Sequence, residues 1–211
     1  MTRRAINNSM RRILLYIIAI LTSIANAEGG FYVGIGAGYA TVANAPQSGY
    51  TFNNLSGGTQ SSSNFASTLY GGYDFNRYVG LEIDYNVAFS GQVASSYNVN
   101  QQVINGVVVL HLPFGIFANA LSGLSIFAKG GVGYSFLGFG AVNPSCTTCV
   151  NPPSIAAGFI PAFGAGVEYG FTNIGIRGEW NYNGSVTAPN LGSNQVAVSS
   201  NIFLLSVLYH F

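Results

Sequence analysis

The chain has 211 residues, of which 49% are apolar and only 6% are charged. Soluble domains carry about 25% charged residues, so this composition argues against a surface that faces water. The scarcity of Lys and Arg also argues against nucleic-acid binding, which needs a basic patch.

The N-terminal residues have the pattern of a secretory signal peptide. Four arginines precede a largely apolar run at residues 13–24, and the run ends in Ala25-Asn26-Ala27. This order predicts cleavage before Glu28, and it divides the chain into a signal peptide, residues 1–27, and a mature domain, residues 28–211. The mature domain keeps three basic and six acidic residues, a formal net charge of −3.

Eight segments of the mature domain alternate large apolar residues with small or polar ones at a period of two, which predicts strands. They are residues 31–39, 65–75, 78–89, 102–117, 124–136, 155–171, 174–182 and 196–211. No later stretch has the roughly 18 to 20 apolar residues of a membrane helix. A closed barrel is the other architecture that satisfies every backbone hydrogen bond in lipid, and it requires an even number of strands.

The connections between these segments alternate in length. Tight links are predicted at residues 76–77, around 122–123 and at 172–173. Long connections are predicted near residues 42–64, 90–101, 137–154 and 183–195. Outer-membrane barrels have short periplasmic turns and longer extracellular loops, so this alternation predicts which end of the barrel faces outward.

Side-chain bulk predicts which face of each strand points outward. One face carries the strand-interior charges together with Gly, Ala and Ser, while the other carries side chains such as Phe159, Phe163 and Phe171. The lumen of an eight-stranded barrel is barely wide enough for its own side chains, so the bulky face must point to lipid. A soluble barrel or a β-sandwich with ordinary core aromatics is the alternative. The sequence therefore predicts an all-β fold, an eight-stranded antiparallel transmembrane β-barrel.

Two hairpins carry a family resemblance. The sequences GGYDFNRYVGLEIDY (residues 71–85), PAFGAGVEYGFTNIGIRGEWNY (residues 161–182) and the final LLSVLYHF resemble the OmpA-type eight-stranded outer-membrane barrel in its short form. The resemblance implies a bacterial outer-membrane location, with outer-membrane lipid, lipopolysaccharide and the barrel assembly machinery as partners. In that family a terminal aromatic residue serves as the assembly signal, and Phe211 stands at that position.

The resemblance also implies a salt-bridge cluster that fills or gates the lumen. The matching positions are Glu82, Lys129, Glu168 and Arg177. Asp84 and Glu179 share their inward parity, which leaves an excess of two carboxylates and predicts that any pore would prefer cations. His111 and His210 have the same parity, and they either help to balance the acids or are simply polar lumen residues. Filling and gating remain alternatives here.

The predicted third long loop contains Cys146 and Cys149. An exported chain favours a disulfide there over free thiols, and a zinc site would need two further ligands. The four long loops lack Asp, Glu, Lys and Arg, so they cannot recognise a ligand by strong charge steering.

The sequence shows no nucleophile and base in a recognisable arrangement, and no metal or cofactor is expected. The predicted function is therefore a non-enzymatic envelope-structural barrel with surface-exposed loops, with adhesion to a host-surface ligand as its most plausible specific role. The alternative is a narrow cation-preferring pore.

Overall fold

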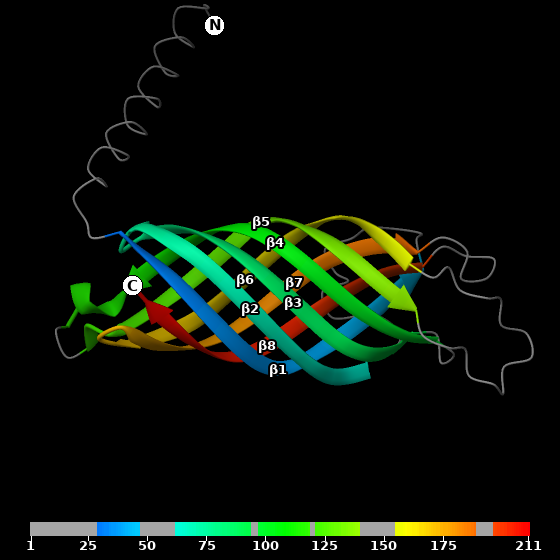
Figure 1. The fold of residues 1–211 in the computed structure, drawn as a ribbon, viewed down its shortest axis with the longest axis horizontal. Coiled ribbons are helices and arrows are strands. Elements are labelled where there is room, and N and C mark those ends of the chain that lie inside the picture. The colour runs from blue at the N-terminus through cyan, green and yellow to red at the C-terminus, as the bar shows by residue number, and fades with distance from the viewer. Residues whose placement is uncertain (1–28, 47–61, 94–96, 119–120, 140–154, 189–195) are drawn as a thin grey trace, which may run out of the picture.

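The computed structural model describes residues 29–46, 62–93, 97–118, 121–139, 155–188 and 196–211. Eight strands form a closed antiparallel barrel in which each strand pairs with its neighbours in sequence and β1 pairs with β8 (Figure 1). This confirms the predicted fold class. The strands are β1 (Gly30–Pro46), β2 (Ser62–Asn76), β3 (Val79–Val93), β4 (Tyr97–Pro113), β5 (Leu124–Phe139), β6 (Ile155–Phe171), β7 (Ile174–Ala188) and β8 (Val196–His210).

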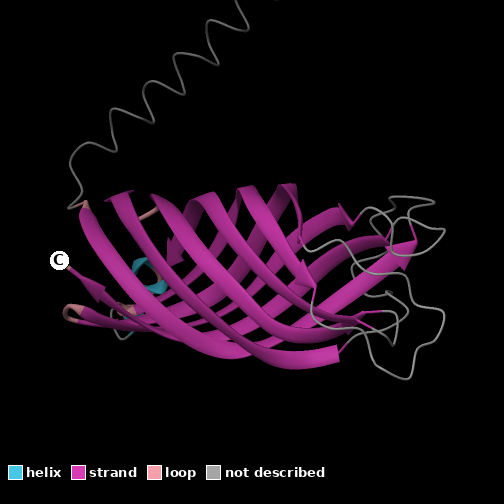
Figure 2. Ribbon diagram, turned by 45° about the vertical axis from the view of Figure 1, so that its right-hand side comes forward, coloured by secondary structure: helices cyan, strands magenta, loops and turns pink. Residues whose placement is uncertain are grey.

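The two ends of the barrel differ. At one end, here named the turn end, two-residue turns join β2 to β3 and β6 to β7. The C-terminus lies at the same end (Figure 1), where the Phe211 backbone N–H donates to the Phe31 carbonyl oxygen at 2.9 Å. The opposite end, here named the loop end, is where β1, β3, β5 and β7 finish. The strands run obliquely between the two ends (Figure 2).

The predicted end of β4 was wrong. The strand stops at Pro113, and Phe114–Ile116 form a 3-10 helix. Proline has no N–H to donate to the ladder and its φ is restricted, so pairing ends at this residue although the apolar pattern continues. The connection to β5 is therefore longer than the tight link predicted around residues 122–123.

The strands also extend further toward the loop end than predicted. The pairing registers shift between Ala88 and Gly91 and between Asn183 and Val186. A bulge adds one residue to one strand and interrupts the alternation of faces. The alternation therefore stops at the bulge although the strand continues beyond it, and the predicted strand ends too early.

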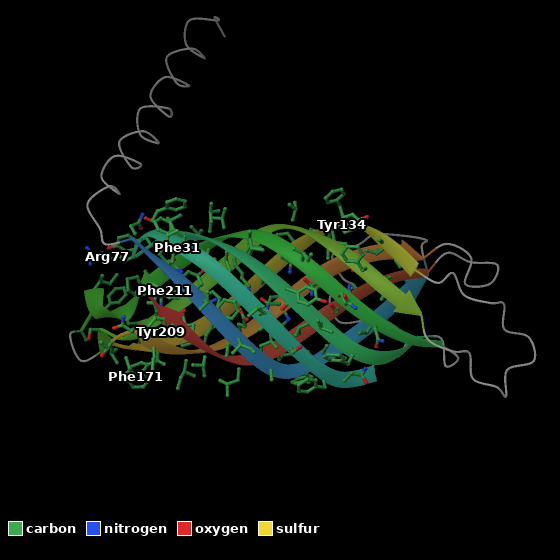
Figure 3. The ribbon with its side chains drawn as sticks, viewed as in Figure 1. Phe31, Arg77, Tyr134, Phe171, Tyr209 and Phe211 are labelled. Atoms are coloured by element: carbon green, nitrogen blue, oxygen red, sulfur yellow. The ribbon has the colours of Figure 1, made fainter. Side chains whose placement is uncertain are left out.

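The exterior of the barrel is largely apolar. Phe31, Phe159 and Phe211 are 65%, 82% and 73% exposed. Phe31, Phe171, Tyr209 and Phe211 gather around the turn end, and Tyr134 lies toward the loop end (Figure 3). Within the described residues, no helix is long and apolar enough to cross a membrane.

The exposed face supports a direct test of the lipid-facing surface. Ile83 is 66% exposed and lies four residues from the Val79 end of β3, about 10 Å along the barrel axis and near the middle of a ~25 Å lipid band. We expect Ile83→Lys to lower the free energy of unfolding by about 2–4 kcal/mol, because the ammonium is forced into hydrocarbon. Urea titration of the barrel refolded into phospholipid vesicles measures this loss.

Ile83→Ala is the control, because it removes the same apolar side chain without adding charge. It should lose clearly less stability than Ile83→Lys. Equal losses in the two variants would mean that this face does not contact lipid.

Candidate functional site

The ionisable residues predicted for the lumen all lie inside the barrel. Glu82 and Asp84 come from β3, Lys129 from β5, Glu168 from β6, and Arg177 and Glu179 from β7. Each is at most 8% exposed. Inward parity on four strands therefore brings charges that are far apart in sequence into one buried network.

Glu82 joins the two cations of this network. Its Oε1 accepts a hydrogen bond from Lys129 Nζ at 3.0 Å, and its Oε2 accepts one from Arg177 Nη1 at 2.6 Å. The Tyr32 hydroxyl donates to the same Oε2 at 2.9 Å. Both carboxylate oxygens are thus satisfied, which a fully buried carboxylate requires.

Lys129 is shared among three carboxylates. Its Nζ lies 3.0 Å from Glu82 Oε1, 3.3 Å from Asp84 Oδ2 and 2.9 Å from Glu179 Oε2. Asp84 also accepts hydrogen bonds from Asn86 and Asn105, whereas Glu179 has Lys129 as its one ion-pair partner among the described residues. Lys129 therefore compensates more negative charge than any other single group of the network.

Arg177 is enclosed by two carboxylates and three aromatic rings. Its Nε and Nη2 donate to Glu168 Oε2 at 3.0 and 2.9 Å. Its guanidinium carbon lies 4.7 Å from the ring centres of Tyr70 and Phe127 and 5.4 Å from that of Tyr32. Planar cations stack well on aromatic faces, so the rings stabilise a charge that has no contact with water.

Sequence reasoning missed these inward aromatics, although a signal was present. Tyr32 has the parity of Gly34, and Tyr70 has that of Gly72. A Cβ at Gly34 would collide with the Tyr70 ring, and a Cβ at Gly72 would collide with the Tyr32 ring. A tyrosine that alternates with glycines thus indicates an inward ring that occupies the space of the missing side chains.

Two histidine–carboxylate pairs lie toward the turn end. His111 Nε2 is 3.6 Å from Asp74 Oδ1, and His210 Nε2 is 3.5 Å from Glu168 Oε1. Asp74 was not among the predicted lumen residues, although its parity matches Tyr70. It raises the excess of lumen carboxylates over Lys and Arg from two to three. Both histidines face acids, as their parity suggested, and each becomes an ion-pair partner when protonated.

Amides and then apolar side chains follow the ions toward the loop end. Asn105 Nδ2 donates to Asp84 Oδ1 at 2.7 Å and to Asn183 Oδ1 at 3.2 Å. Beyond them an apolar layer packs inside the barrel, and five of its larger members are at most 1% exposed: Val42, Val103, Leu137, Val198 and Ile202. The sequence analysis described the inward face as small residues and charges, and it missed this layer.

The described lumen residues do not form a group of three or more His, Cys, Asp or Glu side chains that could hold a metal ion. Cys146 and Cys149 lie outside the described residues. Phe211 ends the chain at the turn end and is 73% exposed, which leaves its ring accessible.

The shared position of Lys129 makes it the most informative residue to remove. We expect Lys129→Met to lower the free energy of unfolding by about 3–5 kcal/mol, because buried carboxylates lose their cation. Adding Glu179→Gln to that variant should recover part of the loss, since it removes a carboxylate that paired with Lys129 alone. Urea titration in lipid vesicles measures both effects.

Arg77→Met is the control, because Arg77 is exposed in the β2–β3 turn and contacts the Tyr78 ring at 5.2 Å. It should change stability by no more than about 1 kcal/mol. A Lys129→Met loss as small as that of Arg77→Met would show that the network does not stabilise the barrel.

Comparisons with known proteins agree with this architecture. The chain matches the model of the outer membrane protein beta-barrel domain family over residues 13–211. It is similar in structure to Neisserial surface protein A, with a TM-score of 0.58, 15% identity, and coverage of 87% of this chain and 99% of that chain. It is also similar to the outer membrane protein OprG from Pseudomonas aeruginosa, with a TM-score of 0.53, 15% identity, and coverage of 88% and 97%.

No curated relative matches the chain by sequence. The low identities to the solved structures show a shared fold alone, whereas the family model covers nearly the whole chain. The chain therefore belongs to the outer membrane protein beta-barrel domain family and is a barrel of the bacterial outer membrane.

Proposed function

We propose that this protein is a non-conducting, non-enzymatic outer-membrane scaffold that displays its long connections at the cell surface for adhesion or host contact. The observation that carries the proposal is the filled lumen. The ion network, the amides and the apolar layer follow one another along the barrel axis. A channel would need water to pass all three.

The apolar layer is the strongest argument against a pore. Leu137 and Val198 are 0% exposed, and Val103 and Ile202 are 1% exposed. Ions cross apolar constrictions only when these are wide enough to stay wet. The lumen excess of carboxylates would favour cations if a path opened, but close packing of these side chains favours a closed state.

The length of the strands favours surface display. They contain 15 to 17 residues each, whereas a tilted strand crosses a bilayer with about 9–11. The extra residues at the loop end extend the barrel beyond the lipid as a short rigid stalk, and the apolar layer is the core of that stalk. The stalk would carry the connections 47–61, 94–96, 140–154 and 189–195, which lie outside the described residues.

The composition of these connections indicates how they would recognise a surface. They contain no Asp, Glu, Lys or Arg and are rich in Ser, Asn, Gly and Thr. Recognition would therefore use hydrogen bonds and contacts of small side chains, with little dependence on salt. A disulfide between Cys146 and Cys149 would restrict the third of these connections.

The non-enzymatic part of the proposal follows from the surroundings of the two histidines. Within the described ranges, each histidine contacts a carboxylate, and no hydroxyl group is hydrogen-bonded to either histidine to act as the nucleophile. Hydrolysis by nucleophilic catalysis needs a base beside the nucleophile.

A closed lumen has a measurable consequence. We expect the folded protein in planar lipid bilayers to give no steady single-channel current, while a large porin in the same bilayers conducts. Steady currents whose reversal potential in a salt gradient shows cation selectivity would contradict the proposal and establish the alternative of a narrow pore.

Surface recognition has a separate test in cells. Replacing residues 47–61 and 140–154 with short Asn-Gly turns should leave the barrel folded, because the strands pair independently of them, but should abolish the binding of expressing bacteria to host cell layers. An Arg77→Met variant, which keeps the loops and changes only an exposed residue of the turn end, is the control and should bind as the unaltered protein does. Undiminished binding without the two loops would contradict the proposed role.

A further inference from the structure

The exterior wall has a shallow hollow where β1, β6, β7 and β8 lie side by side. Its floor is formed by the small outward residues Ala37, Ala165 and Gly178. Its rim includes the aromatic residues Tyr39, Trp180 and Phe203. The hollow is apolar and opens away from the barrel, toward lipid.

The missing side chain at Gly178 creates much of this space. Gly178 pairs with Val167 on one side and Leu205 on the other, and Leu205 pairs with Ala37. A Cβ built on Gly178 would meet no atom within 4 Å. Gly178 thus leaves a gap between Val167 and Leu205 that neighbouring side chains do not fill.

The position of the hollow in the membrane follows from its distance to the turn end. Gly178 lies four residues and Trp180 six residues from Ile174, the first residue of β7. At ~3.3 Å per residue and ~40° tilt, these residues stand about 10 and 15 Å along the barrel axis. Short turns face the periplasm in this class of barrel, so the hollow extends from mid-membrane into the outer leaflet.

Polar side chains lie directly above the apolar hollow, on the side of the loop end. Asn201 pairs with Tyr182 on β7 and with Thr41 on β1, and all three have outward parity. Trp180 Nε1–H donates to the side-chain Oδ1 of Asn201 at 3.1 Å. Among the described residues, the N–H groups of the Asn201 side-chain amide have no acceptor. They are therefore available to a ligand.

We propose that this hollow binds one acyl chain of an outer-leaflet lipopolysaccharide. The chain lies over Gly178 and runs past the aromatic residues of the rim toward the loop end, where the Asn201 side-chain amide donates to a carbonyl oxygen at the point where that chain joins the sugar. The inference rests on the outer-membrane location and is independent of the adhesion proposal. Lipopolysaccharide is the occupant we assign because the hollow faces the outer leaflet, in which this lipid resides.

Arg77, in a turn at the opposite end, is the one charged residue of the described ranges that does not face the lumen. The wall therefore engages the acyl chain and its carbonyl group rather than a phosphate group, and the size of the hollow decides against a protein partner. A stable protein interface needs about 20–30 residues on each side. The hollow is far smaller than that, so it suits one flexible chain better than a second barrel.

The single tryptophan of the chain reports on the site, because Trp180 forms part of its rim. Phospholipid with brominated acyl chains quenches tryptophan on contact. In vesicles of such lipid, we expect lipopolysaccharide to restore Trp180 fluorescence at about a tenfold lower mole fraction than unbrominated phospholipid does. Tenfold corresponds to about 1.4 kcal/mol of preference.

A pair of glycine variants supplies the matched comparison. Gly178→Leu fills the hollow and should abolish the advantage of lipopolysaccharide. Gly106→Leu is the control, because Gly106 on β4 also faces outward with no atom within 4 Å of an added Cβ. It should keep the full preference, and a gel-shift on heating verifies that both variants are folded.

Three results would overturn the proposal. Equal recovery with both lipids would mean that ordinary annular lipid covers Trp180. A preference that survives Gly178→Leu would place the lipid elsewhere. Absence of quenching by brominated lipid would show that protein, such as a second copy of the barrel, covers this wall.

Discussion

The closure of eight strands into a barrel is the constraint on which the rest of this structure depends. Closure pairs every strand edge, and it leaves a lumen only as wide as the side chains that fill it. Large residues must then point outward and small or paired ones inward. The buried ion network follows from the same constraint, because Lys129 and Arg177 have no water to solvate them and must be compensated by carboxylates.

Period two and side-chain bulk were sufficient to predict the barrel, its strand number and the inward position of six ionisable residues. Strand ends were less predictable. A bulge after Ala88, another after Asn183, and Pro113 each change pairing without an unambiguous pattern in the sequence. Such features depend on the partner strand, and a single sequence does not specify how neighbouring strands accommodate an extra residue.

The lumen was predicted only in part. The alternation along a strand tells which face a side chain is on, but not its position along the barrel axis relative to side chains of other strands. Val103 and Leu137 have the same inward parity as the charges, and only the register between strands places them together above the ions. Arg177 was expected to meet carboxylates, but its ring contacts depend on gaps left by glycines on other strands. Contacts across the barrel are therefore the level at which sequence patterns stop being informative.

The two faces of β7 depend on each other. Gly178, the floor of the exterior hollow, lies between Arg177 and Glu179, whose side chains are held inside by Glu82, Glu168 and Lys129. Glycine in a strand interior is normally a source of flexibility. Here the residues on both sides are fixed by buried ion pairs, so the strand keeps its path without a side chain at Gly178. The ion network in the lumen thus helps to hold the shape of the lipid-facing wall.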